Sequence, residues 1–241
     1  MNLANKKAIV IIVEGITDQM ILQSFLEQII DPKKLYIKMM HGDILSDINV
    51  RLGPKAQIGK IMHDIVLERT KFTPENLLMI IQLTDTDGIF IPEENFEVDE
   101  KRTYPQKQRY VYDFDDNKVY FDSIKSKNEI SKTWKMKKQN VDKLKNPYIY
   151  AKKVPYSLYF NSLNLEHVIF DELVNDKKEK VALNFIESLD YDYKLFKTFM
   201  KKKKIGSDFD SSWDQIANNV HWSQSFSNLI YLLKEIETYI S

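Results

Sequence analysis

Three short runs of apolar residues alternate with stretches of helical spacing over the first 90 residues of the chain. The runs are AIVIIV at 8–13, LYIKMM at 35–40 and LLMIIQL at 77–83. AIVIIV is a continuous apolar run, which is typical of a strand that is covered on both faces, as in parallel sheets. The alternation therefore predicts an α/β fold with a mainly parallel, doubly wound sheet and right-handed crossovers.

Two amphipathic helices are predicted between these strands. Apolar side chains recur at helical spacing over 21–29 after the first run and over 58–66 after the second. Thr17 or Asp18 is placed to cap the first helix, because both are good capping residues just before its apolar stripe.

The chain is less regular after residue 90. The alternation in 109–114 and 119–121 predicts a hairpin, and the polar, lysine-rich stretch 123–147 predicts an exposed helical insertion. VPYSLYF at 154–160 predicts one further strand, and helical spacing dominates from 164 onward. We expect one α/β domain over 1–170, with its insertion at about 100–147, followed by a helical C-terminal region over 171–241.

Composition limits the classes of protein to which the chain can belong. Lys+Arg and Asp+Glu each number 35, and no apolar run approaches the roughly 20 residues that cross a bilayer. The N-terminus has no signal-peptide pattern, so we expect a cytoplasmic protein with no membrane partner. The chain has no cysteine, which excludes disulfides, thiolate zinc sites and a cysteine nucleophile.

Acidic residues follow two of the predicted strands. Glu14 comes directly after the first strand, and Asp85 and Asp87 come at the end of the third. If the strand order is 2-1-3, these carboxylates meet at the carboxyl edge of the sheet, where open α/β sheets bind ligands. Their mutual repulsion would be relieved by a cation, and oxygen ligands favour Mg²⁺ or Mn²⁺. The alternative is structural, with Glu14 as a helix cap and Asp-Thr-Asp-Gly as a turn.

Two glycines adjoin these acids. Gly15 follows Glu14 and Gly88 follows Asp87. Because glycine tolerates unusual backbone angles, both are expected to permit turns that leave room for a phosphate.

VEGITD at 13–18, followed by LTDTDG at 83–88, resembles the Toprim domain of topoisomerases, bacterial primases and several nucleases. The resemblance covers about residues 6–90 and extends toward residue 165. It implies that Glu14 acts in general acid/base work and contacts metal, and that Asp85 and Asp87 bind metal. Asp18 matches an acidic position one helical turn beyond the glutamate, although a helix cap is the simpler role for it.

The chain departs from the Toprim pattern after Asp87, where Gly88 leads directly into IFIPEENFE, so the number of metal ions stays open. A second stretch, YFNSLNLEHVIFDE, is distantly similar to a segment of RloB-like and abortive-infection proteins. It makes Glu166 a further candidate, against a structural role on an amphipathic helix.

The basic insertion is the first candidate for a nucleic-acid contact. Residues 122–153 hold many more lysines than acids, and aromatic residues are interleaved with them. Lysines neutralise phosphates and aromatic rings stack on bases, so Lys135, Lys137, Lys138 and Trp134 are the expected contacts. A solvated helix face is the alternative.

These features and the resemblance to the Toprim domain predict a Mg²⁺- or Mn²⁺-dependent nuclease that hydrolyses RNA or DNA. The similarity to RloB-like and abortive-infection proteins implies the role of an effector of bacterial antiphage defence by abortive infection. One alternative is a toxin subunit that acts only when a partner ATPase releases or activates it. Another is a non-catalytic, nucleic-acid-binding Toprim-like protein.

Overall fold

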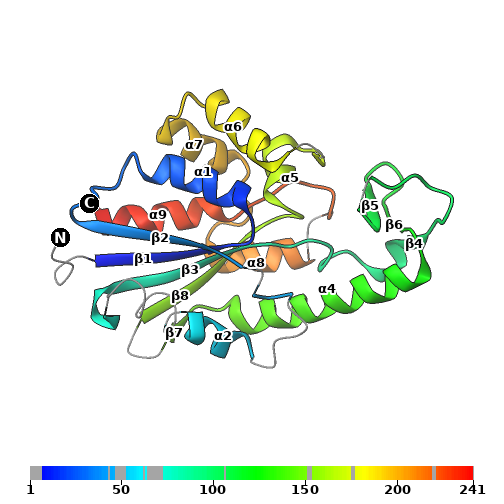
Figure 1. The fold of residues 1–241 in the computed structure, drawn as a ribbon, viewed down its shortest axis with the longest axis horizontal. Coiled ribbons are helices and arrows are strands. Elements are labelled where there is room, and N and C mark those ends of the chain that lie inside the picture. The colour runs from blue at the N-terminus through cyan, green and yellow to red at the C-terminus, as the bar shows by residue number, and fades with distance from the viewer. Residues whose placement is uncertain are drawn as a thin grey trace.

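The computed structural model describes residues 7–42, 44–46, 53–61, 63, 73–105, 107–150, 154–174, 177–218 and 221–240. Its larger sheet has five strands in the order β2-β1-β3-β8-β7 (Figure 1). The bounds of these strands are β1 Lys7–Val13, β2 Leu35–His41, β3 Leu77–Asp85, β7 Tyr148–Tyr150 and β8 Val154–Asn161.

The first four strands of this sheet are parallel. β1 pairs with β2 and β3, and β3 pairs with β8, all in parallel register. This confirms the mainly parallel α/β sheet. The first three strands have the order 2-1-3, which is the condition for the acids to meet at one edge. β7 pairs antiparallel with β8 and occupies the edge, so Pro155 lies near the start of an interior strand.

Helices cover both faces of the larger sheet, as the continuous apolar strands require. Successive residues of β1 alternate between two apolar clusters, with Ile9 and Ile11 in one and Val10 and Ile12 in the other. In Figure 1, α1, α6, α7 and α9 lie above the sheet and α2 and α4 lie below it. The bounds of the helices are α1 Ile16–Leu26, α2 Pro54–Ile61, α4 Ile124–Leu144, α5 Leu165–Phe170, α6 Lys178–Ser188, α7 Tyr193–Lys202, α8 Phe209–Asn218 and α9 Leu229–Ile240.

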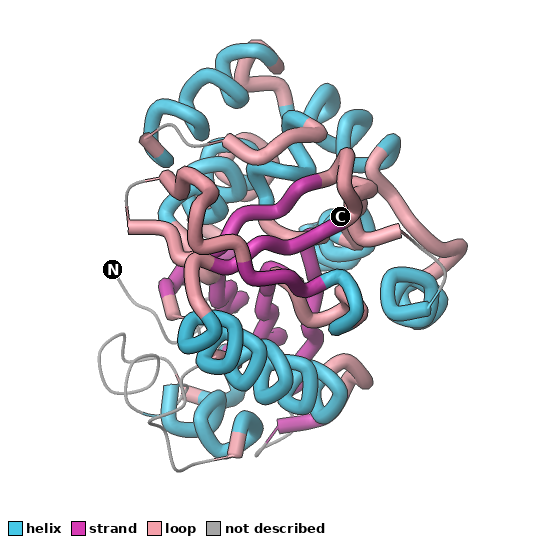
Figure 2. The backbone as a smooth tube through the Cα atoms, turned by 90° about the vertical axis from the view of Figure 1, so that its right-hand side faces the viewer, coloured by secondary structure: helices cyan, strands magenta, loops and turns pink. Residues whose placement is uncertain are grey.

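The expected insertion contains a second, smaller sheet and a long helix. β5 (Tyr110–Asp113) and β6 (Lys118–Phe121) form the predicted hairpin, and β4 (Phe96–Val98) adds beside β6 in parallel. Figure 2, which views this side of the molecule, shows α4 running beneath the small sheet. Short 3₁₀ turns occur at Pro74–Asn76 and Glu93–Asn95.

α4 is a helix as predicted, but one of its faces is buried rather than exposed. Its buried side chains recur every three or four residues, which is the spacing of one helix face. They are Ser126, Ile130, Trp134, Lys137, Val141 and Leu144. Most of the lysines of α4 lie on the opposite, solvated face, and Lys137 is the exception among the buried residues.

The C-terminal region is helical, and it shares the core of the larger sheet. Phe25 of α1 stacks on Phe196 of α7 with 4.3 Å between ring centroids, and α6 packs along α1. The predicted helix over 58–66 begins at Pro54, and residues 62 and 64–66 lie outside the described part of the chain. In the described part, no helix is long and apolar enough to span a membrane.

Candidate active site

The three predicted acids lie at the carboxyl edge of the larger sheet. Glu14 directly follows β1, Asp85 ends β3, and Asp87 lies two residues further on. β1 and β3 are parallel neighbours, so their carboxyl ends meet at the same edge. The loops after β3 and β8 are joined there, because the backbone N–H of Asp87 donates to the Leu163 carbonyl at 2.9 Å.

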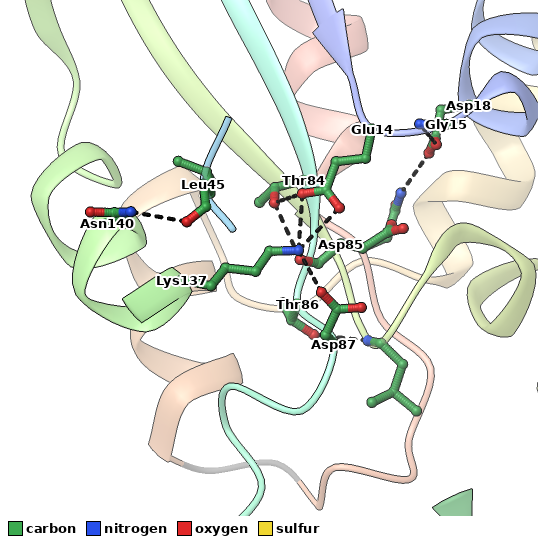
Figure 3. Close-up of polar contacts among 12 residues, drawn as sticks. Glu14, Gly15, Asp18, Leu45, Thr84, Asp85, Thr86, Asp87, Lys137 and Asn140 are labelled. Atoms are coloured by element: carbon green, nitrogen blue, oxygen red, sulfur yellow. Dashed lines mark hydrogen bonds and ion pairs between the residues drawn. The ribbon is translucent and has the colours of Figure 1, made fainter. Parts of the chain in front are cut away.

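A lysine from the insertion reaches into this group of acids (Figure 3). Lys137 Nζ lies 3.0 Å from both carboxylate oxygens of Glu14 and 2.6 Å from Asp87 Oδ2. Its side chain is 0% exposed, against 12% for Glu14 and 31% for Asp87. The expectation that Lys137 contacts nucleic acid from the surface is therefore wrong, because the ammonium group is an internal counter-ion.

Glu14 is held by a second partner. The Thr84 hydroxyl, from β3, donates to Glu14 Oε1 (Figure 3). Thr84 is buried within an otherwise apolar strand. Together, the hydroxyl and the ammonium group fix the direction in which the Glu14 carboxylate points.

Asp85 is the acid with an uncompensated oxygen. Its Oδ1 is buried and has no hydrogen-bond partner among the described residues. Burial and the negative charges of Asp18, Glu14 and Asp87 raise its pKa well above the ordinary value, and Lys137 opposes this shift. The environment of Asp85 therefore disfavours an isolated negative charge and would favour a nearby cation.

A second pair of acids lies beside the first group. Asp18 is buried and accepts hydrogen bonds from the Gly15 backbone N–H at 3.1 Å and from Asn161 Nδ2 at 3.4 Å. Burial first, and then the charge of Glu166, raise the pKa of Asp18 to about 7, although Gly15 and Lys178 oppose the shift. Glu166 is itself buried and accepts from the Thr17 hydroxyl at 3.0 Å.

Asp18 also has the structural role that its position suggested. α1 begins at Ile16 with Gly15 as its N-cap, and Asp18 is the third helical residue. Its side chain satisfies the N–H of that cap, which is one half of a capping box. The N-cap is thus Gly15 rather than Thr17 or Asp18.

Neither glycine has the role expected for it. Gly15 has extended backbone angles that any residue adopts. The positive φ of +46° belongs to Asp87 rather than to Gly88. A Cβ on Gly88 would lie only 2.3 Å from the Trp134 ring. The space above Gly88 is therefore filled by an indole ring instead of being left for a phosphate.

Trp134 is not a surface platform for bases. It is buried and packs edge-on against Phe96 at 5.5 Å and Tyr110 at 5.2 Å between ring centroids. The prediction of a nucleic-acid contact at Trp134 is wrong, because this ring anchors α4 to the small sheet.

Lys135 and Lys138 do lie on the exposed face of α4. Lys135 pairs with Glu93 at 2.8 Å, with both side chains 63% exposed. Lys138 Nζ lies 5.6 Å from the ring centroid of Phe90. Both remain accessible, so their contact with nucleic acid stays a prediction.

The donors at this edge are oxygen ligands of the kind that Mg²⁺ and Mn²⁺ prefer. Among the described residues, however, no group of three or more His, Cys, Asp or Glu side chains stands in a metal-holding arrangement. Lys137 already forms ion pairs with two of the three acids, Glu14 and Asp87. Of the three, Asp85 is the one with a buried carboxylate oxygen that has no hydrogen-bond partner among the described residues.

Sequence reasoning missed the residues that organise the acids. The inward position of Lys137 was visible in the apolar stripe of Ile130, Trp134 and Val141, which places residue 137 on the same helix face. The polar residues that interrupt buried strands, Thr84 and Asn161, were a second signal.

Comparisons of the chain with protein-family models, with curated proteins and with solved structures gave no match. The resemblance to the Toprim domain therefore depends on VEGITD and LTDTDG alone, and the chain is assigned here to no family.

Proposed function

We propose that this protein is a Mg²⁺- or Mn²⁺-dependent phosphodiesterase that cleaves RNA or DNA in the cytoplasm. One observation carries the proposal: the buried Asp85 oxygen, which lacks a hydrogen-bond partner in the described structure, lies where Glu14 and Asp87 also meet. An acid in this environment is stabilised by a divalent cation.

The donor set fits such a cation. Mg²⁺ commonly takes one or two carboxylates and completes its shell with waters and substrate phosphate oxygens, so a cage of three protein acids is not needed. Asp85 would hold the ion, with Asp87 and Glu14 beside it. When bound, the ion would polarise a phosphoryl oxygen and lower the pKa of a bound water.

The chain's own residues supply the remaining chemistry. Glu14 is oriented by Thr84 and Lys137, and we assign it the transfer of a proton to or from the reacting oxygens. Such general acid–base catalysis contributes typically about 10²- to 10⁴-fold. Lys137 offsets the repulsion between the carboxylates of Glu14 and Asp87.

Cleavage of a substrate panel tests this function. Purified protein is incubated with tRNA, ribosomal RNA, plasmid and single-stranded DNA, with Mn²⁺ or with EDTA. Wild type should cleave at least one substrate with Mn²⁺, whereas Glu14→Gln should not. Glu187→Gln, which makes the same change on the exposed side of α6, should behave like wild type. Equal Mn²⁺-dependent cleavage by Glu14→Gln would exclude the role of Glu14.

A second candidate function is an antiphage effector that a partner ATPase holds or activates. The observation that favours it is a set of exposed apolar side chains on α6, on α7 and in the turn between them, since such side chains can mark a protein interface. They are Leu183, Tyr191 and Leu195. Cleavage by the isolated protein would argue against a required partner.

If calorimetry shows no Mn²⁺ binding, a non-catalytic nucleic-acid-binding role is favoured instead.

A further inference from the structure

A cavity of about 460 Å³ lies between β5 and the segment that follows β8. Its walls include Tyr110 and Tyr112 from β5, Ile130 from α4, and Asn164. In Figure 1 the small sheet lies beyond the carboxyl ends of the larger sheet, so the cavity is between that edge and the insertion. Clefts of roughly 300–1,000 Å³ in such places are typical of ligand sites.

The cavity is joined to the candidate active site through two shared elements. Ile130 and Lys137 are about two turns apart on the same buried face of α4. Ile130 lines the cavity, while Lys137 binds Glu14 and Asp87. On the other wall, Asn164 follows Leu163, whose carbonyl accepts the Asp87 N–H.

Electrostatics agree with this proximity. Burial, followed by the charge of Asp87, raises the pKa of Tyr110 to about 12. Asp87 also contributes to the raised pKa of Tyr112, after burial and Tyr110. A group bound in the cavity would therefore lie beside any ligand bound at the candidate active site.

The lining combines aromatic and basic side chains. Tyr110 and Tyr112 are partly buried, and Lys107 and Arg109 are exposed. Arg109 also pairs with Glu129 at 2.6 Å, and the described residues that line the cavity include no Asp or Glu. Aromatic rings and guanidinium planes take unstacked bases, while Lys and Arg neutralise the phosphates of the strand. This set of groups matches a nucleotide.

We propose that this cavity binds one unpaired nucleotide next to the phosphate held at the acids. The substrate is accordingly a single strand, because a base enters a pocket of this kind only when it is outside a stacked duplex. That the acids beside the cavity hold a phosphate rests on the proposed function. Binding of a nucleotide in the cavity does not require that the protein cleaves it.

Binding by a cleavage-deficient protein tests the cavity directly. Full-length Glu14→Gln protein is titrated, with Mg²⁺ present, into a labelled single-stranded DNA, the matching RNA and the matching DNA duplex, and fluorescence anisotropy is read. We expect at least one single strand to bind about 10-fold more tightly than the duplex, since stacking of one base contributes about 5- to 150-fold. Equal or tighter binding of the duplex would overturn the proposal.

Three further substitutions in the Glu14→Gln protein locate the contact. Val174→Trp, which places a large ring in the cavity lining, should weaken single-strand binding about 10-fold or more. Arg109→Ala should weaken it about 10-fold and reduce the slope of log K against log salt by about 1. Glu129→Ala removes the same ion pair but keeps the guanidinium group, so binding should not weaken.

The outcomes separate this proposal from the proposed function. If Val174→Trp and Arg109→Ala bind single strands as tightly as the Glu14→Gln parent, the cavity is not the nucleotide site, even when wild type cleaves. If both weaken binding while wild type cleaves no substrate, the cavity proposal stands and the nuclease assignment fails. Circular dichroism of each variant confirms that it is folded.

Discussion

The ammonium group of Lys137 lies 2.6 Å from Asp87 Oδ2, and the lysine side chain is fully buried. It also contacts Glu14, so a single residue of the insertion joins the carboxyl ends of β1 and β3. The insertion thereby becomes part of the site, although Lys137 lies 50 residues after Asp87 in the sequence.

Lys137→Met should destabilise the protein by about 3 kcal/mol, because it leaves two partly buried carboxylates without their counter-ion. Urea unfolding in EDTA measures this change. Added Mg²⁺ should restore more stability to Lys137→Met than it adds to wild type. Lys135→Met is the control, since that exposed side chain belongs to the same helix and should cost under about 1 kcal/mol. Equal losses for the two variants would remove the special role of Lys137.

Asp85→Asn should change metal affinity and metal-free stability in opposite directions. It removes a carboxylate whose charge is disfavoured by burial and by three neighbouring acids, so the metal-free protein should become more stable at pH 8. Calorimetry should show Mn²⁺ binding weakened at least about 10-fold. A variant that binds Mn²⁺ as wild type does would show that Asp85 is not a ligand.

Asp18 should make the stability of the protein fall as pH rises between about 4 and 7. Its pKa is about 7 in the folded protein, above the ordinary value of 3.8, so in this range the folded state keeps a proton that the unfolded state has lost. The contribution is fully present below pH 3.8 and is lost as pH passes 7.

The slope from Asp18 alone is at most about 1.4 kcal/mol per pH unit. Asp18→Asn should flatten the stability profile over this range and raise the melting temperature at pH 8. Asp214→Asn, at an exposed position of α8, should leave the profile unchanged. If Asp18→Asn keeps the wild-type profile, the carboxyl group is ionised throughout.

Gly88→Ala should destabilise the protein by about 1–3 kcal/mol, the usual range for overpacking. The added methyl group would lie 2.3–2.5 Å from Trp134 ring atoms, so α4 or the loop after β3 must move. Gly53→Ala is the matched control, because no described residue lies within 4 Å of its added Cβ. Chemical unfolding of both variants checks this, and an unaffected Gly88→Ala would contradict the packing of Trp134 on the loop.

The central sheet was predictable because its signals are local. AIVIIV is apolar throughout and LLMIIQL is apolar except for Gln82, as is typical of strands covered on both faces, and they became β1 and β3. Once these strands are parallel neighbours, Glu14 and Asp85 must meet at one edge. Strand order itself was only a condition in that reasoning, since no single stretch of sequence determines which strands pair.

The environment of the acids was not predictable from local signals. Lys137 is one of many lysines in its segment, and charge alone suggested solvent for all of them. Its apolar neighbours on the same helix face, Trp134 and Val141, indicated instead that residue 137 is buried. The partners that α4 would find, such as Gly88 and the small sheet, are set by long-range packing, which helical periodicity does not encode.

The ratio of single-turnover cleavage rates between wild type and Glu14→Gln, at saturating Mn²⁺, tests the central claim most directly. If Glu14 transfers a proton in phosphodiester cleavage, the ratio should be about 100 or more. The Mn²⁺ affinity of Glu14→Gln, measured in parallel, should stay within about 10-fold of the wild-type value, because Asp85 is still present to bind the ion. A ratio near 1, with both proteins folded, would contradict the assignment of this edge of the sheet as the active site.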